Sequence, residues 1–198
     1  IYGIFVRNFV VALKNCGIVF SNSIVINKTS KNITGKIFIY AIFYIKIVYG
    51  WFFYTSDVVY IHYPSHVAPI VVLLNKLKKR KIIINFHGTD LISESRLSKL
   101  LDLFLASLIG IVVLNVVPSS YYQDKLCEKY KNSNCYVYPS GGINLDIFKT
   151  MDRRKSRMQY SLGDDEFVVG YVSRIDKGKG WRTFLQALNT LTEAGVSF

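Results

Sequence analysis

The chain has 198 residues, about half of them hydrophobic, and a formal net charge of +12. That length allows one large domain, or one domain and part of a second, and the hydrophobic content excludes an intrinsically disordered chain. The three cysteines have no even count and no CxxC spacing, which argues against a disulfide framework or a zinc site and fits a reducing cytosol.

The positive charge has two interpretations. A basic surface suits an anionic partner, such as a nucleic acid, an anionic lipid or a phosphorylated small molecule. The other interpretation is a lysine-rich codon usage that spreads charge without function. The densest basic cluster, at residues 76–81, falls at the end of an expected helix, where the helix dipole favours cations, and no nucleic-acid-binding motif accompanies it. We therefore expect no nucleic-acid partner.

The first 54 residues predict a helix, a strand and a second helix. Residues 1–17 begin with a glycine loop at Gly3 and continue as a helix that ends at Gly17, and residues 18–26 predict a strand. Residues 37–54 predict a largely aromatic helix whose length is near the lower limit for a transmembrane span. Because Lys46 would lie at mid-bilayer, we expect this helix to pack in or against the protein, with contact to a membrane surface left open.

From residue 57 onward, short apolar strands alternate with amphipathic helices. The strands are expected at 58–62, 81–86, 111–117 and 135–138. This alternation predicts a Rossmann-like parallel sheet with helices on both faces. Ligands of such sheets bind beyond the carboxyl ends of the strands. Candidate residues at these ends are Gly3, His62, the segment from His87 to Asp90, and the glycine pair at 141–142.

A polar stretch at 149–163 indicates a crossover between two domains, which we place at 1–150 and 151–198. Residues 167–172 then predict a buried strand, followed by a loop of glycines and cations and by a helix from Trp181 onward. A strand, a glycine-rich basic loop and a helix N-terminus together are typical of a phosphate site, to which Arg174 and Lys179 would add charge. The alternative is that both are ordinary surface cations.

Six segments in this order resemble the large family-4 retaining glycosyltransferases (glycosyl transferases group 1): GIFVRNFVVAL, DVVYIHYP, IIINFHGTD, VVPSSYYQDKL, VYPSGGINLDIF and YVSRIDKGKGWRTFLQAL. The resemblance covers nearly the whole chain. It implies the GT-B fold, in which two Rossmann-like domains face each other across a cleft. Residues 1–150 would then be the N-terminal, acceptor-side domain without its first strand, and 151–198 the beginning of the C-terminal domain that binds the nucleotide sugar.

The resemblance also implies roles for single residues. Arg174 and Lys179 would hold the donor diphosphate, and Gly3 would approach the same diphosphate from its glycine loop. His87 would lie near the reacting sugar as the catalytic residue, although a lone histidine at a strand end is more often structural. Asp90 would bind the sugar or the acceptor. The family generally needs no metal, so we expect no cofactor beyond the nucleotide-diphosphate sugar as co-substrate.

The implied function is transfer of a sugar, hexosyltransferase-like, to a hydroxyl of a glycan or lipid-linked acceptor with retention of anomeric configuration, as in polysaccharide biosynthesis. The expected location is the cytoplasm, at the inner face of the cytoplasmic membrane if the basic and aromatic surface contacts lipid. The family's glutamate pair for the donor is not in this sequence, so we expect the 198-residue piece alone to be inactive. The alternative is a non-catalytic Rossmann-like module that binds a phosphorylated ligand or an anionic membrane surface.

Overall fold

The computed structural model describes residues 4–28, 30–92, 96–131, 134–139, 145–173 and 177–196. The chain forms two compact units, Ile1–Gly142 and Ile143–Phe198, each of which is considered by itself. The sequence pattern placed the division after residue 150, a little further along the chain.

The first unit is built on a parallel sheet of four strands that pair in chain order. These strands are β1 (Val58–His62), β2 (Lys81–Asn85), β3 (Leu114–Val117) and β4 (Cys135–Val137). Their register places Ile61 beside Ile84, and Ile84 beside Asn115. The four predicted strands are therefore confirmed, and with them the α/β class and a Rossmann-like parallel sheet.

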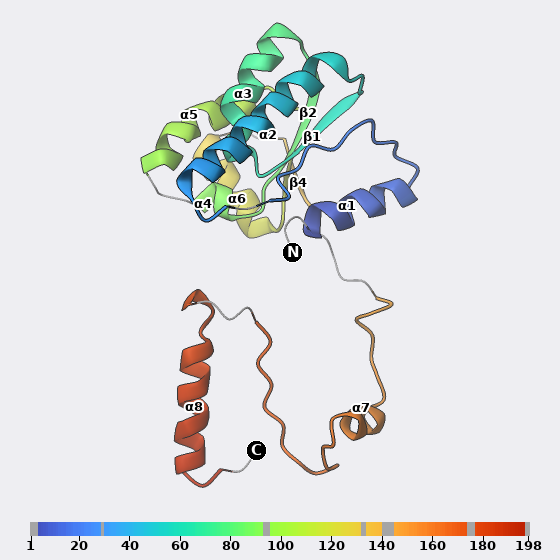
Figure 1. The fold of residues 1–198 in the computed structure, drawn as a ribbon, viewed down its shortest axis with the longest axis vertical. Helices are drawn as coiled ribbons and strands as arrows, with labels where there is room; N and C mark the ends of the chain where they lie inside the picture. The colour runs from blue at the N-terminus through green and yellow to red at the C-terminus, as the bar shows by residue number, and fades with distance from the viewer. Residues whose placement is uncertain are drawn as a thin grey trace. The chain divides into compact units, whose positions relative to one another are not determined.

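The connections between strands supply one helical layer. They contain α3 (Pro64–Leu77), α4 (Thr89–Ile92), α5 (Arg96–Ile109) and α6 (Ser120–Tyr130). Because parallel crossovers are right-handed and the strands pair in chain order, α3, α5 and α6 cover the same face of the sheet. Figure 1 shows α3 and α5 next to each other, and they are in contact. Ile82, Ile84 and Leu108 are completely buried between these layers.

Helix α1 (Ile4–Asn15) contacts the opposite face of the sheet. Its Phe9 ring lies 4.7 Å from the ring of Tyr60, which points away from α3 because side chains alternate along a strand. The helix stops at Gly17, whose φ of 84° belongs to the left-handed region that glycine tolerates. The Gly17 N–H donates to Lys14 O at 2.9 Å. The predicted end of this helix is confirmed.

The strand expected at 18–26 is wrong. The structure describes all nine of these residues, and they form irregular chain in which Val19 is 91% exposed. A strand requires a neighbour that accepts its backbone hydrogen bonds, which an apolar pattern alone does not reveal. Here the polar residues favour local bonding instead, since the Asn22 side chain accepts a hydrogen bond from Ser23 N at 2.8 Å.

The aromatic helix is confirmed as α2 (Ile33–Phe53), which packs along α3. Trp51 is only 4% exposed, and its indole N–H donates to Lys78 O at 2.9 Å. Tyr44 Oη donates to His66 O at 3.0 Å. Among the described residues, α2 is the one helix with the length and apolar composition of a membrane span, and little of it is buried. The prediction of a helix that lies against the protein therefore holds.

The second unit contains α7 (Arg153–Gln159), a 3-10 turn (Lys177–Lys179) and α8 (Trp181–Glu193). The predicted helix from Trp181 is confirmed, but the predicted strand at 167–172 is wrong. These residues form no strand, and Val172 is 100% exposed. The described part of this unit contains no other strand that could accept the backbone hydrogen bonds of an apolar segment.

Candidate functional site

The carboxyl ends of β1 and β2 bring two histidines into direct contact. His62 ends β1 opposite Asn85, and His87 follows Asn85 by two residues. The two imidazoles form a hydrogen bond, with 2.9 Å between His62 Nδ1 and His87 Nε2. The sequence pattern placed both histidines at strand ends but proposed a catalytic role for His87 alone, because a lone histidine such as His62 is more often structural. The direct contact between the two rings depends on the register of β1 against β2, which the sequence pattern did not give.

The turn after β2 holds His87 in place. Gly88 has a φ of +100°, and a Cβ on it would lie 2.6 Å from Tyr122 Oη, so any other residue would be strained here and would require Tyr122 to move. The Asp90 carboxylate accepts a hydrogen bond from the backbone N–H of His87, with 3.0 Å to Oδ1. The structure thus gives Asp90 a contact that closes the turn. Its predicted role in binding sugar or acceptor stays a prediction.

Tyr63, which follows β1 and precedes α3, covers the His87 ring. The two rings are stacked, with centroids 4.0 Å apart and an interplanar angle of 15°. Tyr63 has a φ of 54°, although it precedes Pro64 and residues before proline normally adopt extended backbone. The strain is held by a hydrogen bond from Tyr63 N to Asn85 O at 3.2 Å. Backbone strain of this kind is concentrated at functional sites, which adds weight to this end of the sheet.

Burial keeps both imidazoles neutral at pH 7. Burial, together with the neighbouring His87, lowers the pKa of His62 from its ordinary 6.5 to about 4. Burial also lowers the pKa of His87. Burial raises the pKa of Asp90 from 3.8 to about 6, against the opposing effect of backbone hydrogen bonds to its carboxylate. The site therefore offers uncharged imidazole, which can donate or accept a hydrogen bond without carrying charge.

The tautomer of the pair follows from burial. His62 Nε2 is buried and has no hydrogen-bond partner among the described residues. A buried N–H without an acceptor is rarer in native structures than an unmatched acceptor, so we assign the His62 proton to Nδ1. His62 then donates to His87 Nε2, and His87 carries its own proton on Nδ1. His87 can therefore offer an N–H donor from Nδ1 to a polar group of a ligand.

Of the predicted phosphate loop in the second unit, the structure describes residue 173 and residues 177–180. Lys179 is exposed at the end of the 3-10 turn, and Gly180, with a φ of 76°, precedes the first residue of α8. Among the described residues, no side chain caps the first turn of α8, and no acidic residue lies in that turn, so its backbone N–H groups suit an anion. Tyr171 ties the loop to the helix, because its hydroxyl donates to Lys179 O and its ring stacks on Phe184.

Several predicted site residues cannot be placed. Gly3, Arg174 and the glycine pair at 141–142 lie outside the described residues. Among the described His, Cys, Asp and Glu residues, no three lie close enough together to hold a metal ion. That the reaction needs no metal stays a prediction.

Comparison with known proteins finds no family model that matches this chain and no curated protein similar to it in sequence.

Proposed function

We propose that the full-length gene product is a retaining glycosyltransferase of the GT-B fold that uses a nucleotide-diphosphate sugar as donor. The observation that carries the proposal is the histidine pair at the carboxyl ends of β1 and β2, where ligands of parallel sheets bind. His87 is neutral and is fixed by the Gly88 turn and by Asp90, and the assigned tautomer gives it an N–H donor at Nδ1. Preorganised donors of this kind are suited to a polar substrate such as a sugar.

In the proposed reaction, the bond between the anomeric carbon and the diphosphate oxygen breaks, and a bond from the same carbon to the acceptor oxygen forms on the same face. The acceptor's proton passes to the departing diphosphate. Negative charge develops on the leaving oxygen, so cations and N–H groups aimed at it stabilise the transition state more than the ground state. We assign this role to Arg174, Lys179 and the first turn of α8, and we assign a contact with the transferred sugar to His87.

The acceptor is proposed to be a hydroxyl of a glycan or a lipid-linked sugar, and the location the cytoplasm at the inner face of the membrane. The basic charge of the chain and the aromatic helix α2 support this proposal, because both suit a reaction near anionic lipid.

The test measures release of nucleoside diphosphate by the full-length gene product with a panel of nucleotide sugars. Lys179→Ala and His87→Ala should each lower kcat/KM by at least about 100-fold. The matched control is Lys155→Ala, which removes an exposed cation from α7 of the same unit as Lys179 and should leave the rate unchanged. Wild-type rates in both site variants would overturn the proposal.

A further pair of variants tests the assigned tautomer. The amide nitrogen of Asn occupies a position close to that of imidazole Nδ1, whereas the amide nitrogen of Gln reaches toward Nε2. His87→Asn should therefore retain more activity than His87→Gln. Nucleotide binding without turnover in the wild-type protein would instead support the non-catalytic alternative, a module that binds a phosphorylated ligand.

A further inference from the structure

Helix α2 leaves a long apolar face without a partner in the described part of the chain. We define the outer face of α2 as six exposed residues: Ile37, Phe38, Ile42, Ile45, Tyr49 and Phe53. Of these, Ile45 is 67% exposed and Phe53 is 70% exposed. At 1.5 Å per residue this face extends about 24 Å along the helix. Scattered apolar side chains are normal on a protein surface, but a contiguous stripe of this length marks an interaction site.

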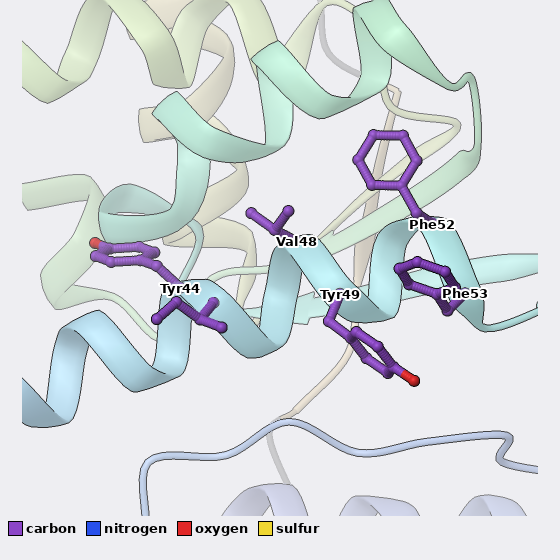
Figure 2. A pocket seen from close by; sticks show the side chains of 6 residues that line it. Tyr44, Val48, Tyr49, Phe52 and Phe53 are labelled. Atoms are coloured by element: carbon purple, nitrogen blue, oxygen red, sulfur yellow. The ribbon is translucent and has the colours of Figure 1, made fainter.

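Figure 2 shows the groove on this helix and the side chains that line it. The lining residues are Tyr44, Ile45, Val48, Tyr49, Phe52 and Phe53, so all of them belong to α2 itself. A helix that is apolar on every side is normally covered on every side. Among the described residues, α2 is covered by its contact with α3, by the burial of Trp51 and, at Gly50, by Ile24, whose Cδ1 lies 3.1 Å from the position of a Cβ on that glycine.

Hydrogen bonds fix α2 to the first unit and determine which face is free. The Arg80 guanidinium donates to Trp51 O, with 2.6 Å from Nη2, and Lys78 Nζ donates to Phe52 O at 3.0 Å. The Trp51 indole donates in return to Lys78 O. A helix that crossed a bilayer would have to give up these contacts with the loop before β2. The geometry therefore favours a helix that lies on a membrane rather than one that crosses it.

The distribution of charge along the chain indicates that the partner of this face is anionic. Residues 1–89, which contain α2, carry eleven Lys and Arg and a single acidic residue, Asp57. Residues 90–198 are nearly balanced, with fourteen basic and twelve acidic residues. The net positive charge of the protein is thus concentrated in the segment that presents the apolar face. Lys36 and Lys46 are exposed on α2 itself, and their long side chains can reach a headgroup while the neighbouring apolar residues are buried.

We propose that the outer face of α2 binds the surface of an anionic lipid bilayer, with the helix axis parallel to the membrane. The apolar and aromatic side chains enter the boundary between headgroups and acyl chains, and Lys36 and Lys46 contact anionic headgroups. This face consists of residues of α2 and includes neither histidine of the pair, and the proposal does not depend on the proposed transferase activity.

The test is sedimentation of the full-length gene product with phosphatidylcholine vesicles, with and without 30% phosphatidylglycerol, at low and high salt. Binding should be at least tenfold tighter to the anionic vesicles and should weaken with salt. Ile45→Glu should reduce it at least tenfold. The matched control is Leu103→Glu, at a residue of α5 that is 71% exposed but outside this face, and it should leave binding unchanged. The proposal would be overturned if the wild-type protein did not bind anionic vesicles at low salt, or if Ile45→Glu and Leu103→Glu bound them equally well.

A fluorescent reporter on α2 can show whether the helix lies at the headgroup level of the membrane. A Phe53→Trp variant should show a blue-shifted emission on binding and quenching by lipids brominated near the headgroup. Two other outcomes contradict the proposal: retention of the protein in membranes after alkaline carbonate extraction would indicate a span, and a lipid-free dimer dissociated by Ile45→Glu would indicate that the face joins two copies of the chain.

Discussion

The histidine pair makes a prediction about the pH dependence of stability. His62→Phe replaces a mostly buried imidazole by an apolar ring among the rings of Phe9 and Tyr60. A base whose pKa is lower in the folded protein binds fewer protons there than in the unfolded chain. The contribution of His62 to the free energy of unfolding is therefore present above pH 6.5 and is lost as the pH falls toward 4.

The magnitude follows from the two pKa values. With 6.5 in the unfolded chain and about 4 in the folded one, the His62 contribution falls by about 2 kcal/mol between pH 7 and pH 5. Asp90 acts in the opposite direction. Its pKa is raised to about 6, so its contribution rises by about 1 kcal/mol over the same interval. His87, whose pKa is also lowered by burial, and Asp90 titrate in both proteins. The contribution of His62 is therefore isolated in the difference between the free energies of unfolding of His62→Phe and wild type, which should shift in favour of the variant by about 2 kcal/mol from pH 7 to pH 5.

The assay is urea unfolding at both pH values in a Trp181→Phe background, which leaves Trp51 of the first unit as the only tryptophan. The measured quantity is the free energy of unfolding of His62→Phe minus that of the parent, and it should increase by about 2 kcal/mol from pH 7 to pH 5. His66→Phe, which removes an exposed histidine from α3, is the matched control. A difference that is independent of pH, or that changes in the opposite direction, would refute the account of the pair.

Two substitutions test the packing around this site. Gly88→Ala should lower the free energy of unfolding by roughly 1–3 kcal/mol, because it combines a positive φ with a clash against Tyr122. The control is Gly110→Ala, whose Cβ would make only ordinary contacts and which should leave the free energy of unfolding unchanged. Equal effects of the two variants in thermal unfolding would contradict this explanation of the Gly88 turn. Trp51→Phe should cost about 1–2 kcal/mol, because it removes the hydrogen bond to Lys78 O; an unchanged denaturation midpoint would show that this bond does not anchor α2.

The sequence predicted the sheet well where strand and helix alternate regularly. β1, β2, β3 and β4 lie where apolar runs are bounded by turns, and each finds a parallel neighbour. Similar apolar runs at 18–26 and 167–172 also predicted strands, and both of these predictions are wrong. An apolar pattern shows that a segment can be buried, but the presence of a neighbouring strand is a property of the whole fold.

The candidate site was predicted in part. His87 was identified from its strand end and its motif, but its partner His62 lies 25 residues earlier in the chain, and only the register of β1 against β2 brings them together. The stacking of Tyr63 on His87 depends on a backbone conformation that is unusual before proline, so no sequence rule would have predicted it. Asp90 was identified as a polar group, but its hydrogen bond to the turn depends on local geometry.

The most direct test of the proposed function is the stereochemistry of the product. The full-length gene product is incubated with a nucleotide sugar that it turns over and with an acceptor, and the first product is followed by proton NMR through its anomeric signal. A retaining glycosyltransferase releases one nucleoside diphosphate for each new glycosidic bond and keeps the anomeric configuration of the donor. Inversion at that carbon, or no turnover of any nucleotide sugar by the full-length protein, would contradict the account.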